Sequence, residues 1–91
     1  MAHLIDYDNA RLLIETGGAR SVYGQHVPGG YLVILRTGVG DKVLQRSNAY
    51  PPEPRIIRSG EGLLSTFRKL GVRHAEIDLG MPVPRGQKDI F

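Results

Sequence analysis

Eight basic side chains lie in the middle of this 91-residue chain, and their guanidinium and ammonium groups are suited to binding anions. Residues 31–73 carry these eight against three acidic residues, a net charge of +5, whereas residues 1–30 and 74–91 each carry −1. A basic module between mildly acidic ends favours nucleic acid or an acidic protein surface as the partner. The alternative is that the same residues only keep the outer faces of a sheet soluble. The candidate binding residues are Arg36, Lys42, Arg46, Arg55, Arg58, Arg68, Lys69 and Arg73.

A second kind of chemistry is conceivable at His74, Glu76 and Asp78, which alternate along a predicted strand and would share its outer face. Such a trio can hold a divalent metal. Metal sites, however, usually need three or four convergent ligands, and an exposed strand face is normally polar. A metal-dependent activity at these residues is therefore the third hypothesis, behind two binding functions.

The glycines between Thr37 and Lys42 invite a nucleotide-binding interpretation. A P-loop, however, joins a strand to a helix, and here a second strand follows. A hairpin turn explains the glycines better. No nucleophile and base are spaced for covalent catalysis, so we expect no enzyme, no cofactor and no small-molecule substrate.

The length and composition indicate one small domain with a thin core. There is no cysteine, which excludes disulfides and thiolate metal sites. The longest apolar run, residues 31–35, is far shorter than the roughly 20 residues of a membrane span, and the N-terminus has no signal-peptide pattern. We therefore expect a cytoplasmic protein without membrane contact.

Two helices are predicted from their caps and apolar spacing. Asp6 or Asp8 can cap a short helix over residues 9–15, which Gly17 would end. Ser59 can cap an amphipathic helix whose last turn carries Arg68 and Lys69, where cations complement the helix dipole.

An antiparallel meander of three or four strands is predicted between the helices, and a last strand returns to the sheet. The strand at residues 31–37 is apolar on both faces, which is typical of a central strand covered on both sides. One cover is the second helix; the other is either the N-terminal helix or a partner subunit. This pattern favours a homodimer. The predicted strands are residues 21–27, 31–37, 42–46, 55–58 and 73–79.

Taken together, these elements predict an α+β fold in which residues 1–80 form a single domain and residues 81–91 an extended or disordered tail. In one pairing register of such a sheet, Arg36, Lys42 and Arg46 would gather on one side together with Arg55 or Arg58, where arginines can contact phosphates.

Residues 22–80 resemble the ParC family of partition-associated proteins, which are small proteins of plasmids and integrative elements. The resemblance lies in Gly30-Tyr31, Arg36-Thr37, the segment from Arg55 to Ser59, the segment from Leu70 to Arg73, and Asp78-Leu79. It implies an accessory protein of a mobile genetic element that acts through protein and DNA contacts, and no catalytic residue carries over. The competing hypothesis is a protein-interaction or inhibitor module that binds no nucleic acid.

Overall fold

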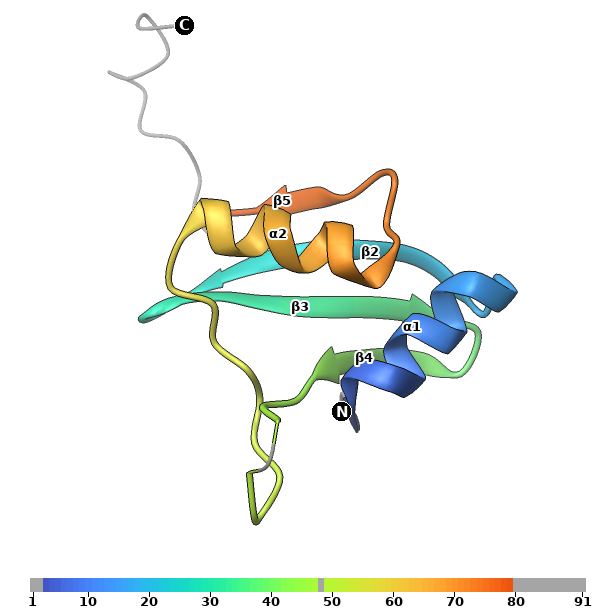
Figure 1. Cartoon of the computed structure of the whole chain (residues 1–91), viewed down its shortest axis with the longest axis horizontal. Coiled ribbons are helices and arrows are strands. Elements are labelled where there is room, and N and C mark those ends of the chain that lie inside the picture. Colours follow the sequence, from blue (N-terminus) through green and yellow to red (C-terminus); the bar gives the residue numbers. More distant parts are fainter. Residues whose placement is uncertain (1–2, 48, 80–91) are drawn as a thin grey trace, which may run out of the picture.

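The structure is a computed structural model that describes residues 3–47 and 49–79, and it has an α+β fold (Figure 1). Within this part of the chain the elements follow in the order β1 (His3–Ile5), α1 (Tyr7–Thr16), β2 (Ala19–Val27), β3 (Gly30–Thr37), β4 (Gly40–Leu44), α2 (Gly60–Leu70) and β5 (Glu76–Asp78). No helix among these residues is long and apolar enough to span a bilayer.

The strands form one mixed sheet in the order β1-β4-β3-β2-β5. β2, β3 and β4 make the antiparallel meander that the sequence predicts, with Tyr23 opposite Ile34 and Ile34 opposite Val43. The short outer strands are parallel to their neighbours, β1 to β4 and β5 to β2. The sheet is therefore wider than the meander alone.

Both predicted helices are confirmed, together with their caps. The Asp6 carboxylate accepts a hydrogen bond from the Asn9 N–H at 3.0 Å, and α1 ends at Gly17, whose φ is 80°. The Ser59 hydroxyl accepts one from the Gly62 N–H at 3.0 Å, and α2 ends at Gly71. Helix α1 begins at Tyr7, two residues before the predicted start.

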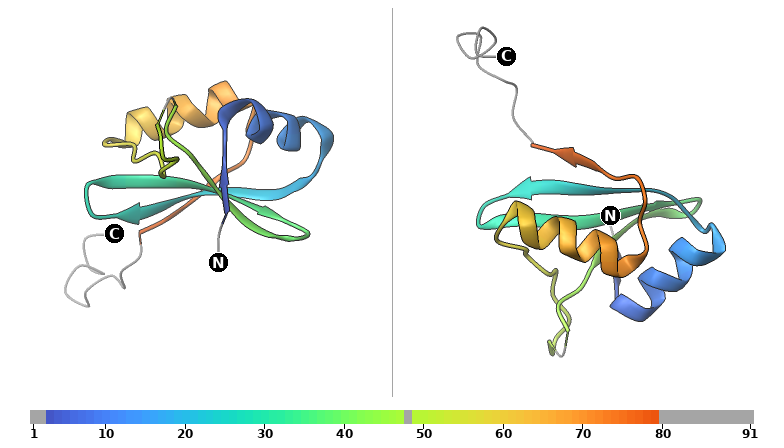
Figure 2. Two further views of the ribbon diagram at one scale, coloured as in Figure 1. Left: turned by 90° about the horizontal axis from the view of Figure 1, so that it is seen from below. Right: turned by 45° about the horizontal axis from the view of Figure 1, so that its top comes forward.

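Both helices cover the same face of the sheet (Figure 2). The topology explains why. β1, β2, β4 and β5 all run in one direction, and the two crossovers, β1-α1-β2 and β4-α2-β5, advance the same way across the sheet. Because crossovers between parallel strands are right-handed, each places its helix on the same side. The alternative in which the N-terminal helix covers the second face is therefore wrong.

The core lies between this helix layer and the sheet. α1 contributes Ala10, and α2 contributes a stripe of apolar residues at helical spacing. The sheet contributes one face of each central strand. The buried residues of this cluster are Ile5, Ala10, Val22, Val33, Leu35, Leu44, Ile57, Leu63, Phe67 and Leu70.

Two predicted strands differ from the structure. Residues 55–58 form no continuous strand; two isolated bridges join Gln45 to Pro54 and Tyr31 to Ile57. The prolines at positions 51, 52 and 54 lack backbone donors and precede this segment. The last strand spans only Glu76–Asp78, so His74 precedes it and the three side chains do not share one strand face. The predicted tail, residues 81–91, lies outside the described residues.

The segment that follows β4 is held against β3 at a glycine. Gly30 has φ of 152°, and a Cβ there would overlap the carbonyl of Ile57, whose N–H and C=O both bond Tyr31 at 2.8 Å. Gly40 has a similarly positive φ of 122°, but a Cβ there meets nothing within 4 Å.

We therefore expect Gly30→Ala to lower the free energy of unfolding by about 3 kcal/mol, since backbone strain and overlap add together. Gly40→Ala is the matched control and should cost about 1 kcal/mol, from backbone strain alone. Urea unfolding followed by circular dichroism measures both. Equal losses would contradict the close approach of Gly30 to Ile57.

Candidate nucleic-acid interface

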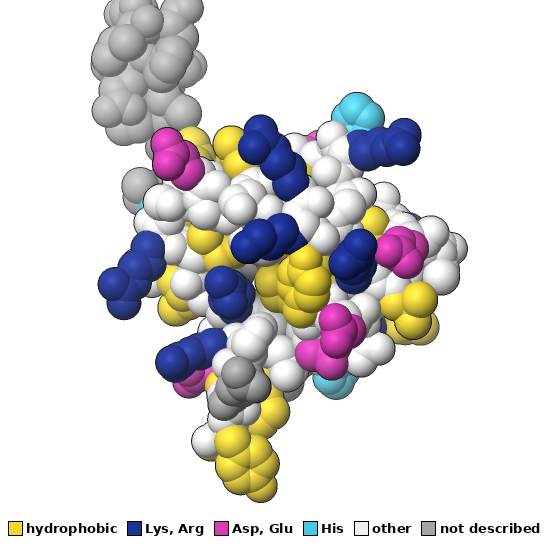
Figure 3. All heavy atoms as spheres, in the orientation of Figure 1, with side chains coloured by type: hydrophobic (Ala, Val, Ile, Leu, Met, Phe, Trp, Pro, Cys, Tyr) yellow, Lys and Arg dark blue, Asp and Glu magenta, His cyan; other side chains and the backbone are white. Residues whose placement is uncertain are grey.

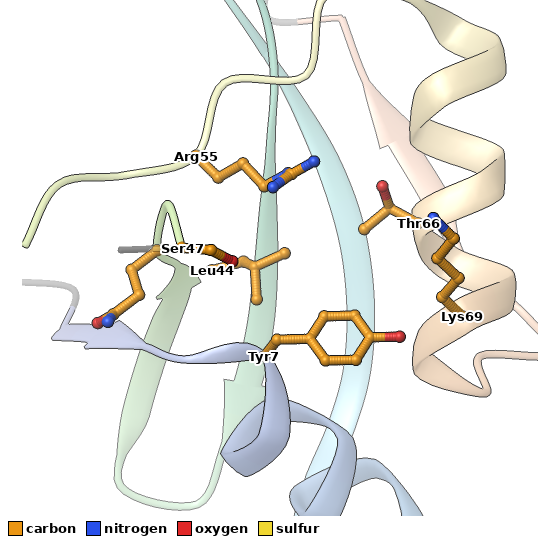
Figure 4. Close-up of a pocket in the computed structure, with 7 residues that line it drawn as sticks. Tyr7, Leu44, Ser47, Arg55, Thr66 and Lys69 are labelled. Carbon is orange, nitrogen blue, oxygen red and sulfur yellow. The ribbon is translucent and has the colours of Figure 1, made fainter. Parts of the chain in front are cut away.

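The helix-covered face carries Lys and Arg side chains around a central hydrophobic patch (Figure 3). On this face a hollow of about 250 Å³ lies between α1, α2 and the segment that follows β4. Arg55, Lys69 and Tyr7 extend into it from these three parts of the chain (Figure 4). We call this hollow the helix-side groove, and its lining residues are Tyr7, Leu44, Gln45, Ser47, Arg55, Thr66 and Lys69.

Local backbone structure fixes each of its functional side chains. The Arg55 N–H donates to the Leu44 carbonyl at 2.9 Å, which holds this residue beside the end of β4. Lys69 lies in the last turn of α2, and Tyr7 is the first residue of α1 and packs partly against the core. The groove is therefore built on rigid elements at two of its three sides.

The groove is electrostatically asymmetric. None of its described lining residues is acidic. A neighbouring hollow shares Tyr7, Gln45 and Ser47 with it and is also lined by Asp6 and Asp8. An anion is thus attracted to the Arg55 and Lys69 end and repelled from the other, while the Tyr7 ring lies between the two.

The structure does not bring all eight predicted basic residues together. Arg36 and Lys42 lie on opposite faces of the sheet, because Arg36 pairs with Asp41, whereas Lys42 pairs with the core residue Leu35. Directly paired residues share a face and consecutive residues alternate. The expectation that Arg36, Lys42 and Arg46 gather on one side with Arg55 or Arg58 is therefore wrong.

The other predicted basic residues fall into small groups on different parts of the surface. Three pairs each line one hollow: Arg55 with Lys69 in the helix-side groove, Arg68 with Arg73 between α2 and β5, and Arg46 with Arg58 beside Leu32. Arg46 also forms an ion pair with Glu53 at 2.8 Å. Arg36 lies over the ring of Tyr23, 5.1 Å from its centre.

Sequence reasoning missed Tyr7, which is the aromatic residue of the groove. Asp6 as the cap places Tyr7 at the first helical position, and that was the available signal. Of the other tyrosines, Tyr31 packs against the core and meets His26 edge to face, and Tyr50 is 98% exposed on the loop after β4. Among residues 3–47 and 49–79, no three His, Asp or Glu side chains converge as metal ligands.

Comparison with protein-family models, with curated proteins and with solved structures finds no match for this chain. The resemblance to the ParC family therefore stays a prediction.

The Arg46–Glu53 ion pair is exposed on both sides, with 67% and 53% of the two side chains accessible. Exposed pairs contribute about 0–1 kcal/mol. We expect Glu53→Gln to change the free energy of unfolding by less than about 0.5 kcal/mol, as measured by urea unfolding. A loss several times larger would show that this pair organises the loop after β4.

Proposed function

We propose that this chain is a non-enzymatic protein that binds nucleic acid through its basic middle, with the helix-side groove as the central contact. The observation that carries this proposal is the convergence of Arg55 and Lys69 on one hollow with the ring of Tyr7 (Figure 4). Two cations from separate segments can each contact a phosphate of the same strand. The Tyr7 ring lies between these cations and the acidic end of the groove, where a base can stack on it.

The groove favours single strands over duplex. A base can stack on Tyr7 only if its own face is free, and in a duplex it is not. The hydroxyl of Ser47, which also lines the groove, offers a hydrogen bond to a base edge. The phosphate then lies at the Arg55 and Lys69 end, away from Asp6 and Asp8.

The lack of buried polar or charged side chains among the described residues supports a binding role over a catalytic one. Among the described residues no polar or charged side chain is buried, whereas catalytic groups usually lie in desolvated clefts. A role as an accessory protein of a mobile genetic element rests on the ParC resemblance of residues 22–80 alone.

Neutralising the groove should weaken binding and flatten its salt dependence. We expect Arg55→Ala combined with Lys69→Ala to lower the affinity for a single-stranded oligonucleotide at least tenfold. The magnitude of the slope of log K against log salt should fall by about 1.4, since each of the two lost phosphate contacts removes about 0.7. Fluorescence anisotropy between about 50 and 200 mM salt measures both quantities.

Arg20→Ala is the control, because Arg20 is exposed beside Gly38 and does not line the groove. It should change the affinity less than threefold. Because the control removes one charge and the double variant two, a control loss of about half the double variant's loss in log K would mean that binding follows net charge and not this groove.

The stacking role of Tyr7 is tested separately. Tyr7→Leu should weaken single-strand binding by about 1–3 kcal/mol, the usual contribution of one stacked base, while Tyr7→Phe should retain it. Duplex binding should be unaffected by either change. Equal affinities for Tyr7→Leu and Tyr7→Phe would exclude stacking, and thermal unfolding of both variants controls for the packing of Tyr7 against the core.

A protein-interaction or inhibitor module is the second candidate, and one feature favours it. A groove between α2 and β5 exposes Leu64 and Ile77, at 49% and 45%, and is lined also by Arg68 and Arg73. An apolar floor with cations beside it complements an acidic, partly apolar segment of another protein. No binding of any oligonucleotide at about 50 mM salt would sink the first proposal and leave this one.

A further inference from the structure

The face of the sheet opposite the helices carries a continuous apolar row. The register aligns Leu4 of β1, Val43 of β4, Ile34 of β3 and Tyr23 of β2 side by side. Residues paired in this way share a face, and their chain neighbours Ile5, Leu44, Val33, Leu35 and Val22 belong to the core on the other face. We call the surface that this row crosses the open face.

The open face is a second apolar layer, separate from the core. Ile34 and Val43 are only 9% and 8% exposed, yet neither belongs to the core cluster under the helices. Leu32 and Val27 lie on the same face and line a hollow of about 800 Å³ at one end of it. A sheet that is apolar on both faces is expected to be covered on both.

Helix α1, which the sequence pattern allowed as a cover for the open face, does not lie on that face. α1 lies with α2 on the other side, because both crossovers are right-handed and advance in the same direction (Figure 2). Of the two covers that the sequence pattern allows, a partner subunit remains.

We infer that a second copy of this chain packs on the open face, sheet against sheet. The residue types on the open face are distributed as in a protein interface, with apolar side chains in the centre and charged ones at the rim. Arg36 and Asp41 lie toward one end of the central strands, and Glu76 lies on the outer strand β5. The stacked pair of Tyr23 and Arg36 consists of two residue types that dominate binding energy at interfaces.

Both signs of charge on one face suit a two-fold axis. In such an interface each copy presents the same surface, so Arg36 of one copy can meet the acidic rim of the other, and the reverse. The area is also sufficient. Five strands of these lengths present on the order of 450 Å² in projection, and side-chain relief raises this to about 600 Å² per copy, at the low end of stable interfaces.

This arrangement turns the two helix layers outward. Each copy then presents its helix-side groove to solvent on the opposite side of the pair. The inference is independent of the proposed function, because it uses none of the residues that line that groove.

Sedimentation velocity over about 1–200 μM protein, the range that brackets micromolar association, tests the inference. We expect a monomer–dimer equilibrium in that range. Leu32→Asp should weaken it at least tenfold, because a carboxylate would be buried against the apolar surface of the other copy. Leu12→Asp places the same charge on the exposed side of α1, where Leu12 is 55% accessible, and should leave the equilibrium unchanged. A monomer at every concentration overturns the inference, whether another protein covers the face or none does. Weakening of the dimer by Leu12→Asp alone also overturns it.

A crosslinking measurement keeps the test decisive if Leu32→Asp does not fold. The chain has no cysteine, so single-cysteine variants react at one site. Gln25→Cys lies on the open face, and Ser65→Cys lies exposed on α2. A bifunctional maleimide that spans packed sheets, about 10 Å apart, should link copies of the first variant and not the second. The reverse result would place the contact on the helix layer and overturn the inference.

Discussion

Leu63 of α2 lies directly on Gly24 of β2, and this contact holds the helix layer close to the sheet. Leu63 is fully buried, and a Cβ at position 24 would lie 2.7 Å from its Cδ2 atom. A side chain in the strand at this point would lift α2 away from β2. Because α2 packs this closely on β2, Phe67 and Leu70 reach the core. Lys69, in the same turn, is directed to the edge of the helix layer, where the groove forms.

The right-handedness of the two crossovers also fixes where the helices lie. It places α1 beside α2, so Tyr7 at the start of α1 faces Lys69 near the end of α2, and the segment carrying Arg55 closes the third side (Figure 4). The same rule leaves the opposite face without a helix. The helix-side groove and the open face are thus two results of one topology, and they lie on opposite sides of the sheet.

Local signals in the sequence predicted the helices and the meander well, since caps, hairpin glycines and apolar periods depend only on neighbouring residues. Asp6, Gly17, Ser59 and Gly71 all do what their residue types indicate. The outer strands are different. β1 and β5 have three residues each, too few for a period, and their places beside β4 and β2 depend on long-range pairing. Without the sheet order, the common face of the helices was not predictable. The separation of Arg36 from Lys42 depends instead on the exact pairing register of the β3–β4 hairpin. Six of the eight predicted basic residues therefore lie outside the helix-side groove, and Tyr7 was missed.

Binding in the helix-side groove is best tested by titrating the ¹⁵N-labelled chain with a short single-stranded oligonucleotide and following the amide chemical shifts. We expect the largest shifts at the amides of Tyr7, Arg55, Thr66 and Lys69, around the groove. Amides beside the open-face residues Tyr23, Ile34 and Val43 should change little. Shifts centred on the open face, or no shifts at low salt, would contradict binding in the groove.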